Sequence, residues 1–241
     1  MKGNSQFAQT NSNSEYAGKN VLWAGERSLT NYNQDLIAKL TKNYKSAKDV
    51  LEFGAGIGTL ASLWEKATQV KPECLEIDPE QRLIIQSRGF TCYENLSSLR
   101  KNFDVIYASN VLEHIEDDLQ TLRELNAKLK PGGTLMLYVP AFRMLYSELD
   151  EKVGHYRRYQ RAELLGKLQA AGFTVNKYYF ADSLGFFAWL YMKVKGYSSG
   201  STEETRMKIY DRYLFPLSRT LDQLGLRLLF GKNILVFARK D

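Results

Sequence analysis

The stretch VLEFGAGIG, residues 50–58, constrains the fold of this chain more than any other. Its first four residues form an apolar run that predicts a buried strand, and the chain then turns on Gly54, Ala55 and Gly56. Glycines at such a turn adopt backbone angles that other residues avoid, and they let a ligand approach the backbone closely. Gly58 follows at the start of a helical pattern. The stretch therefore predicts a strand, a tight turn and a helix, with a ligand at the turn.

Apolar strands and helical segments alternate along the rest of the chain. The predicted strands cover residues 48–54, 73–78, 89–94, 103–109, 134–140, 173–180 and 233–239. Helical spacing is found over residues 28–45, 57–67, 79–88, 115–129 and 161–171. This alternation is typical of a mostly parallel sheet with helices on both faces. We predict a seven-stranded, doubly wound, Rossmann-like α/β fold, whose ligands bind beyond the carboxyl ends of the strands.

The pattern divides the chain into four parts. Residues 1–27 are predicted to form a flexible arm, because the beginning of the chain is rich in Asn, Ser and Gln. Residues 28–181 hold the core with its N-terminal helix. Residues 182–231 form a helical insertion between the last two strands, and residues 232–241 contain the last strand.

The positive charge of the chain is concentrated near its end. The net charge is +6, and residues 184–241 contribute +5 of it through ten Lys or Arg against five Asp or Glu. Such a balance favours anionic partners without identifying one.

The cysteines predict no metal site. Cys74 and Cys92 lie in apolar, strand-like runs, which favours buried reduced thiols over a disulfide. Two cysteines without a histidine cluster do not make a zinc site.

The N-terminus lacks the apolar segment of a signal peptide, and no apolar run approaches the ~18 residues that span a bilayer. We therefore expect a cytoplasmic protein, with peripheral contact to the inner face of the membrane as an open alternative.

Two carboxylates indicate the kind of ligand at the glycine turn. Glu52 stands two residues before Gly54 in a GxGxG pattern, which differs from the GxGxxG pattern of dinucleotide sites. A carboxylate there would repel a pyrophosphate but suit an amino group or a sulfonium. Glu76 ends the second predicted strand, where an acidic side chain can accept hydrogen bonds from ribose hydroxyls. Asp78 is better explained as the cap of the next helix.

The stretch YASNVLEHIEDD, residues 107–118, follows the fourth predicted strand. Ser109, Asn110 and Val111 can offer backbone groups to the amino acid part of a ligand. His114 lies near the same edge of the sheet, where it could either contact the ligand or pack at the start of the next helix.

Four stretches together resemble the class I S-adenosylmethionine-dependent methyltransferases: VLEFGAGIG, LEIDPE, FDVIYASNVLEHIEDD and LKPGGTLMLYVP. The resemblance covers residues 48–140 and implies S-adenosylmethionine as cofactor. It implies that Glu52 and the glycine turn contact the methionine part, that Glu76 holds the ribose and that Ile77 packs on the adenine. Where the family often has aspartate near the adenine amino group, this chain offers Glu94 and Asn95. The resemblance also implies that the last two strands form an antiparallel pair.

Two further stretches resemble a bacterial branch of this family that has no assigned substrate. They are NYNQDLIAKL, before the glycine turn, and DEKVGHYRRYQRAELLGKLQAAGF, after the fifth strand. This narrower resemblance therefore carries no acceptor with it.

The stretch GHYRRYQR follows the fifth strand and concentrates chemically useful side chains. His155 is the natural base to remove a proton from an acceptor, since an imidazole titrates near neutral pH. Arg157 and Arg158 could form forked hydrogen bonds to a carboxylate or phosphate. Tyr156 and Tyr159 could form walls of the pocket.

The surroundings of this stretch leave two explanations open. Residues 141–160 have no clear periodicity beside a predicted cofactor site, which favours a lid or a substrate loop. Alternatively, the arginines are solvated and the stretch simply leads into helix 161–171. We also assign Tyr32, on the first predicted helix, to the acceptor site.

The insertion has three possible roles. Residues 184–194 are apolar but too short to cross a membrane. Residues 206–230 repeat apolar residues at helical spacing among basic ones, and Pro216 predicts a division into two helices. The insertion could cap the pocket, form a homodimer surface, or lie through residues 184–230 on anionic lipid. Nucleic acid fits less well, because no module that recognises it is found.

The sequence thus predicts an enzyme that transfers a methyl group from S-adenosylmethionine to oxygen or nitrogen of a small or lipid-linked, anionic acceptor. The alternative is a catalytically silent chain of the same fold that serves as a partner subunit. A nicotinamide oxidoreductase fits less well, because Glu52 and the missing third glycine of GxGxxG oppose it.

Overall fold

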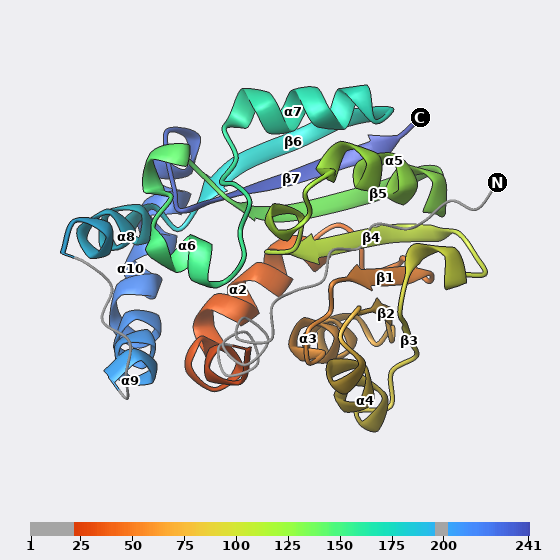
Figure 1. Ribbon diagram of the computed structural model, residues 1–241, viewed down its shortest axis with the longest axis horizontal. Helices are drawn as coiled ribbons and strands as arrows, with labels where there is room; N and C mark the ends of the chain where they lie inside the picture. Colours follow the sequence, from red (N-terminus) through yellow and green to blue (C-terminus); the bar gives the residue numbers. More distant parts are fainter. Residues whose placement is uncertain (1–21, 196–201) are drawn as a thin grey trace.

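The computed structural model describes residues 22–195 and 202–241 and shows a seven-stranded sheet between two layers of helices (Figure 1). The strand order is β3-β2-β1-β4-β5-β7-β6. The strands are β1 (Val50–Phe53), β2 (Glu73–Leu75), β3 (Cys92–Tyr93), β4 (Phe103–Ser109), β5 (Leu129–Pro140), β6 (Phe173–Ala181) and β7 (Asn233–Lys240). The strands from β1 to β5 pair in parallel, and β7 pairs antiparallel with both β5 and β6. The sheet is therefore mixed, with the predicted antiparallel pair at one edge.

The helices follow the predicted alternation. They are α2 (Thr30–Thr41), α3 (Thr59–Thr68), α4 (Pro79–Ser87), α5 (Asp118–Lys128), α6 (Glu148–Lys152), α7 (Arg161–Ala170), α8 (Ser183–Lys195), α9 (Thr202–Ile209) and α10 (Phe215–Gln223). Of these, α6 was not predicted.

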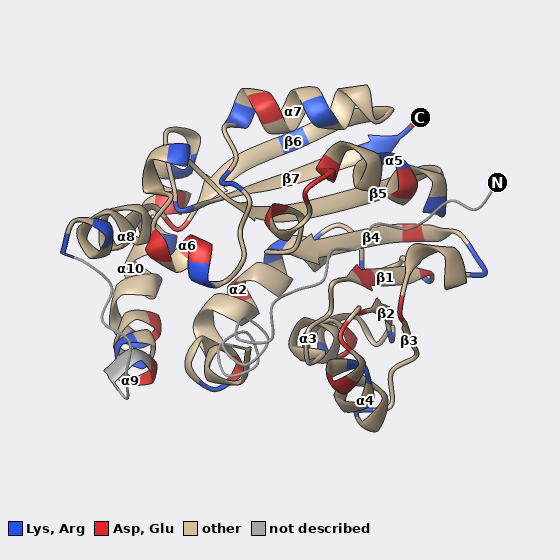
Figure 2. Cartoon of the chain, viewed as in Figure 1, with Lys and Arg blue, Asp and Glu red and all other residues tan. Residues whose placement is uncertain are grey.

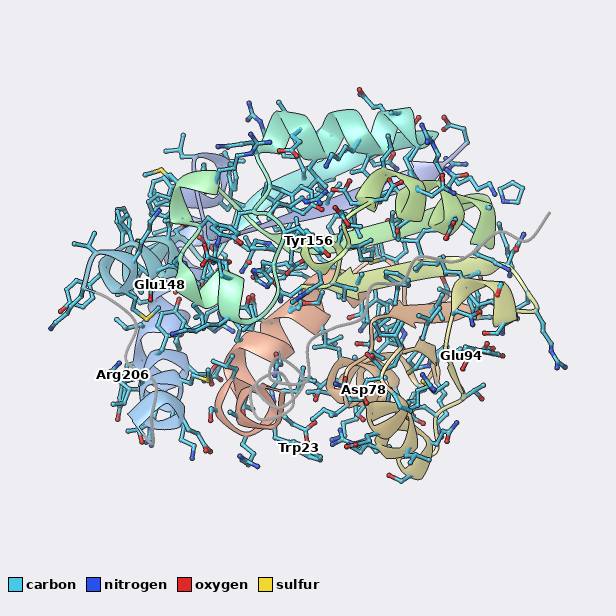
Figure 3. All side chains as sticks on the ribbon, in the orientation of Figure 1. Trp23, Asp78, Glu94, Glu148, Tyr156 and Arg206 are labelled. Atoms are coloured by element: carbon cyan, nitrogen blue, oxygen red, sulfur yellow. The ribbon has the colours of Figure 1, made fainter. Side chains whose placement is uncertain are left out.

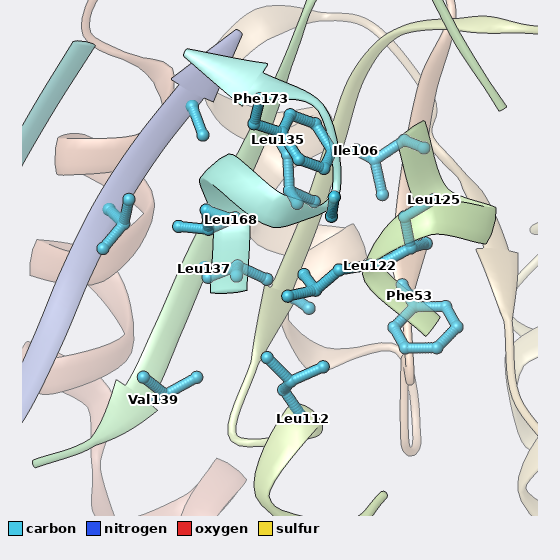
Figure 4. Close-up of a cluster of buried hydrophobic side chains, with 14 of the residues drawn as sticks. Phe53, Ile106, Leu112, Leu122, Leu125, Leu135, Leu137, Val139, Leu168 and Phe173 are labelled. Atoms are coloured by element: carbon cyan, nitrogen blue, oxygen red, sulfur yellow. The ribbon is translucent and has the colours of Figure 1, made fainter. Parts of the chain in front are cut away.

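One face of the sheet is covered by α5 and α7, which lie on the upper side of the sheet in Figure 1. Leu122 and Leu125 of α5 and Leu168 of α7 pack on apolar strand residues such as Leu137 and Ile106 (Figure 4). These side chains are fully buried or nearly so. Their burial stabilises the layer by about 1.5–3 kcal/mol for each large side chain.

The other face is covered by α2, α3 and α10. Leu36 and Leu40 of α2 pack against this face of the sheet together with Phe215 of α10. Trp64 of α3 is fully buried and stacks on Tyr107 of β4, with ring centroids 4.7 Å apart. A sheet covered on both sides explains why its strands read as continuous apolar runs.

The structure corrects two boundaries near β5. The helix predicted over 115–129 begins only at Asp118, because Asp117 caps it by accepting the Gln120 N–H. The residues before it form a short 3-10 helix, η2 (Leu112–His114). The KPGG stretch, predicted to separate a helix from a strand, belongs to β5, where Gly132 adopts φ +75° and the register with β4 shifts.

The last part of the segment predicted as a flexible arm, residues 1–27, is helical instead. Residues 22–28 are helical, and residues 1–21 lie outside the described part. The helical segment is fixed by Glu26, whose carboxylate accepts two hydrogen bonds from the Arg88 guanidinium at 2.8 and 3.0 Å. A bidentate ion pair thus holds residues that the sequence placed in the arm.

The insertion forms helices α8, α9 and α10 at one end of the molecule, where Figure 2 shows basic residues on α8 and α9. The segment holds two α-helices as predicted, α9 and α10, with Pro216 in the first turn of α10; a π-helical turn, η4 (Tyr210–Leu214), joins them, so residues 202–223 stay helical. A wider turn accommodates a residue that lacks an N–H. Asp211 in that turn also accepts the backbone N–H groups of Asn31 and Tyr32, each at 2.9 Å.

Within residues 22–195 and 202–241, no helix combines the length and the apolar character needed to cross a bilayer.

Candidate active site

The glycine turn lies where β1 ends and α3 begins. Gly54, Gly56 and Gly58 all have positive φ, at +73°, +57° and +79°. A side chain at Gly54 would also collide with Val111, whose Cγ2 lies 2.4 Å from the position of a Cβ atom. The turn therefore depends on glycine both for its backbone angles and for its contact with the segment after β4.

Glu76 lies beside this turn, immediately after β2. Its carboxylate accepts the Gly56 N–H at 2.8 Å and the Asp78 N–H at 3.0 Å. Burial raises the pKa of Glu76 above its usual value. Next to it, Ile77 is 64% exposed, an unusual position for a large apolar side chain beside a buried carboxylate. Asp78 caps α4 by accepting the N–H groups of Glu80 and Gln81, as the sequence predicts.

Glu52 lies in the interior of the sheet instead of on an open surface. It is only 3% exposed, and its carboxylate accepts the Tyr107 hydroxyl at 3.0 Å. Burial raises the pKa of Glu52 to about 8. The charged form that would attract a cation is therefore disfavoured unless a positive group comes close.

The segment after β4 presents its backbone at the same edge of the sheet. Asn110 is exposed and adopts φ +53°, a conformation that asparagine tolerates better than most residues. Its N–H is donated to the Tyr138 carbonyl at 2.8 Å. Ser109 precedes it and is half-buried. Asn95, the predicted adenine contact, caps the 3-10 helix η1 (Leu96–Ser98) by accepting the Ser98 N–H.

The helical segment 22–28 covers the glycine turn, which the sequence did not predict. Leu22 lies 3.2 Å from the position that a Cβ atom on Gly56 would take. Trp23 and Glu26 hold Arg88 by a cation–π contact and an ion pair (Trp23 is labelled in Figure 3). No periodicity signals this contact, because the partners are far apart in sequence.

The GHYRRYQR stretch lies beside the segment after β4, and Asp150 binds two of its side chains. The Tyr156 N–H is donated to the Glu113 carbonyl at 2.8 Å, which joins the two segments. Asp150 is fully buried and contacts His155 Nδ1 at 2.7 Å and Arg158 Nε at 2.8 Å. Burial alone would raise the pKa of Asp150, but the hydrogen bond from His155 and the charge of Arg158 outweigh it and lower the pKa.

Three predicted acceptor residues are internal. Arg158 is 2% exposed, bound to Asp150 and covered by the Trp189 ring at 4.5 Å. Tyr159 is fully buried and donates its hydroxyl to Asp118 at 2.8 Å. Tyr32 is buried as well, and its hydroxyl donates a hydrogen bond to the Tyr138 hydroxyl. The structure therefore corrects their expected role: each has polar partners inside the chain, which a pattern of residue types does not reveal.

Arg157 and Tyr156 lie closer to solvent. Arg157 pairs with Asp118 at 2.9 Å and donates to the Glu116 carbonyl at 2.8 Å. Tyr156 is 48% exposed and is labelled in Figure 3. Tyr156 therefore exposes its side chain to an acceptor, whereas Arg157 would have to give up its contacts with Asp118 and Glu116.

Glu113 is a further buried carboxylate that sequence reasoning missed. It is fully buried, and burial raises its pKa to about 8. Its own backbone N–H lies close enough to lower the pKa somewhat. Neither carboxylate oxygen, however, has a partner at hydrogen-bonding geometry among the described residues. His155 Nε2 lies 3.8 Å from Glu113 Oε1, and the rings of His114 and His155 meet edge to face at 4.5 Å.

Comparison with known proteins identifies the family. A family model described as a methyltransferase domain matches residues 26–178, more than half of the chain. The chain belongs to the class I S-adenosylmethionine-dependent methyltransferases. A protein of Mycolicibacterium smegmatis, named a probable S-adenosylmethionine-dependent methyltransferase, is 28% identical over 152 residues. The match covers 59% of this chain and 56% of that relative, so the chain spans little more than half of its length.

Solved structures show the same methyltransferase fold. Phosphoethanolamine N-methyltransferase 2 of Haemonchus contortus, in complex with S-adenosylmethionine, matches with a TM-score of 0.63 and 15% identity, covering 96% of this chain and 60% of that one. A methyltransferase of Archaeoglobus fulgidus matches with a TM-score of 0.55 and 20% identity, covering 86% and 94%. At these identities the likeness concerns the fold alone.

The residues at the carboxyl ends of the strands fit the cofactor of this methyltransferase family. A buried carboxylate at Glu76 offers acceptor oxygens, and the exposed Ile77 offers an apolar surface. In the turn from Gly54 to Gly58, only Ala55 and Ile57 carry a side chain. These are the groups that a ribose, an adenine ring and a close backbone approach require.

Proposed function

We propose that this chain transfers a methyl group from S-adenosylmethionine to an oxygen or nitrogen of a small or lipid-linked, anionic acceptor. The observation that carries the proposal is the position of His155. Through the contact of Tyr156 with Glu113, His155 is tied to the segment that follows β4. That segment also packs on the glycine turn through Val111.

Glu76, Ile77 and the glycine turn would hold the cofactor. Glu76 would accept hydrogen bonds from the ribose, Ile77 would pack on the adenine, and Ser109 and Asn110 would offer backbone groups to the methionine part. When bound, S-adenosylmethionine supplies an electrophilic methyl group on a sulfonium. Segment 22–28 would exclude water from the turn, since Leu22 and Trp23 already cover that side.

His155 would accept the proton that the acceptor loses. Asp150 binds His155 Nδ1 at 2.7 Å, so that Nε2 is the nitrogen left for the acceptor. A carboxylate in this position fixes the tautomer and the orientation of the ring. Tyr156, which is exposed, would contact the acceptor.

The charge of the chain supports an anionic acceptor. The insertion adds the basic residues that give residues 184–241 their net charge of +5.

The insertion would combine two of the roles that its sequence left open. Its inner side would act as a cap, a role supported by the hydrogen bonds of Trp189 to the Leu145 carbonyl at 3.0 Å and of Lys193 to the Met144 carbonyl at 2.6 Å. Its outer side exposes large apolar side chains, the most exposed being Val194, Leu224, Leu228, Leu229, Tyr213 and Tyr191. Exposed apolar residues among basic ones suit the surface of an anionic membrane, where a lipid-linked acceptor would be found.

The first test is a calorimetric titration with S-adenosylmethionine, S-adenosylhomocysteine and NAD in parallel. Saturable binding of the two S-adenosyl ligands but not NAD is expected, with loss in Glu76→Ala and retention in Glu124→Gln, which changes an exposed carboxylate on α5. Absence of S-adenosyl binding by the folded chain would refute the proposal and favour a silent partner subunit.

Acceptors can then be screened with His155→Ala as the test of catalysis. This variant should bind the cofactor as the wild type does and lose turnover. Unchanged turnover would remove His155 from the mechanism. Flotation with phosphatidylglycerol vesicles at low salt tests the membrane surface, and failure to float would leave only the capping role.

A further inference from the structure

The only two histidines of the chain meet beside a buried carboxylate. Glu113 and His114 lie in η2, after β4, whereas His155 lies in the segment before α7. One donor atom from each of the three residues lies within 4.8 Å of the others. Glu113 is buried, His155 half-buried and His114 exposed, so the cluster opens to solvent on the His114 side.

The Glu113 carboxylate is suited to a cation. It is fully buried, and neither oxygen has a hydrogen-bond partner among the described residues. An ionised carboxylate without a partner in the interior is costly, and proteins normally pair it with a cation or a metal. His155 Nε2 faces this carboxylate, at 3.8 Å from Oε1.

Asp150 orients His155 as the second shell of a metal site does. The contact of Asp150 with Nδ1 at 2.7 Å leaves Nε2 directed toward Glu113. Metal-binding histidines almost always give their other nitrogen to a carboxylate or carbonyl, which fixes the ring. Asp150 is itself held by the Ser147 N–H at 2.9 Å and by Arg158 Nε. The imidazole is therefore positioned from outside the cluster.

We propose that Glu113, His114 and His155 bind a divalent transition-metal ion, such as Zn²⁺, in a site with an open position on the solvent side. Two imidazoles and one carboxylate form a known ligand set for such ions, with a further position left for water or substrate. Bonds of about 2.0–2.2 Å require the three donor atoms to move together by roughly an ångström. The sequence predicted no metal site because its two cysteines stand without a histidine cluster, and the two histidines come together only in the folded chain.

This inference goes beyond the proposed function, because metal binding requires no methyl transfer. It changes the role of His155, which would be a ligand in the metal-bound protein and a free base only without the metal. The competing explanation is internal: Arg158 Nη1 also lacks a partner among the described residues, and the charge of Arg158 lowers the pKa of Glu113. In that case the two side chains form an ion pair and no metal binds.

The test uses the full chain without a histidine tag, stripped of metal with a chelator and titrated with ZnCl₂ by calorimetry. Melting curves at increasing Zn²⁺ give a second measurement, since a ligand specific for the folded state raises the melting temperature with its concentration. The variants are Glu113→Gln and His155→Gln in the cluster, and Asp150→Asn behind it. Cys92→Ser and Glu94→Gln are matched controls outside the cluster.

One Zn²⁺ per chain is expected, with affinity reduced by about tenfold or more in both cluster variants. Asp150→Asn should weaken binding by about 10–100-fold, as second-shell changes do. Without metal, Glu113→Gln should melt no lower than the wild type, because it removes a carboxylate that lacks a hydrogen-bond partner among the described residues. Calorimetric binding of S-adenosylmethionine by Glu113→Gln checks that the cofactor site is intact.

Three results would overturn the proposal. One is the absence of Zn²⁺ binding by the folded wild type. Another is binding that Glu113→Gln leaves unchanged or that Cys92→Ser abolishes. The third is a metal-free Glu113→Gln variant that melts clearly lower than the wild type, which would identify the internal ion pair with Arg158.

Discussion

Replacing Gly54 by alanine tests the glycine turn most directly. Gly54 has φ +73°, and a Cβ atom there would lie 2.4 Å from Val111 Cγ2 and 2.6 Å from Cγ1. Real Cβ atoms do not approach other atoms so closely, so either Val111 or the turn must move. The same substitution therefore strains the backbone and forces apart two segments of the proposed cofactor site.

The expected cost follows from these two effects. An L-residue in the left-handed region costs about 1–2 kcal/mol. Forcing an extra methyl group into a packed contact typically costs about 1–3 kcal/mol. Gly54→Ala should thus lower the free energy of unfolding by about 2–5 kcal/mol, a large share of the about 5–15 kcal/mol that is typical of a domain.

Gly166→Ala is the matched control, because it makes the same chemical change with the opposite expectation. Gly166 lies inside α7, and nothing lies within 4 Å of its Cβ position. Alanine in a helix interior is favoured over glycine by about 0.5–1 kcal/mol. Urea unfolding followed by tryptophan fluorescence measures both variants, since Trp64 is fully buried against Tyr107.

A double-mutant cycle separates the two effects. Adding Val111→Ala to Gly54→Ala should relieve the collision and recover about 1–3 kcal/mol as coupling energy. The reasoning is refuted if Gly54→Ala is as stable as the wild type, or if Val111→Ala gives no coupling.

Three further predictions concern carboxylates. Glu76→Gln should weaken S-adenosylmethionine binding by about tenfold or more in calorimetry, since hydrogen bonds to a charged group contribute about 1.5–3 kcal/mol; an unchanged Kd would contradict the ribose assignment. The pKa of Asp118 is lowered, because the hydrogen bonds from Lys167 and Tyr159 outweigh the effect of burial. Its stabilisation is therefore present above the unfolded value of about 3.9 and is lost as pH falls through the folded pKa. Acid unfolding curves of Asp118→Asn should lack this loss, and identical slopes would disprove it. The pKa of Glu52 is raised by burial to about 8, so stability should decline as pH rises from about 4.3, where the unfolded chain ionises, towards 8. Glu52→Gln should remove this decline in urea titrations between about pH 5 and 8, whereas a decline of the same size would mean that another group causes it.

Much of the cofactor side could be predicted from sequence because its signals are local. The apolar run before Gly54, the carboxylate at the end of β2 and the cap at Asp78 each depend on a few neighbouring residues. The order and spacing of these stretches then identify the family. By contrast, the helix predicted over 115–129 begins only at Asp118, because the cap at Asp117 decides where α5 begins.

The acceptor side could not be predicted in the same way. The sequence predicts Arg158 and Tyr159 of GHYRRYQR as acceptor contacts, yet Asp150 and Asp118 bind them inside the chain. The sequence contains no sign that segment 22–28 covers the glycine turn or that Trp189 covers Arg158.

The sequence by itself thus determined the alternation of strands and helices, the glycine turn and the family. Those features depend on periodicity and turn chemistry, which act over a few residues. Only the tertiary structure decided which polar side chains are internal, and that Glu113 meets both histidines without a hydrogen-bond partner among the described residues. Burial and pairing depend on contacts between segments far apart in sequence, such as Asp211 with Asn31, 180 positions away. Folding alone brings such groups together, and their chemistry is set by what surrounds them.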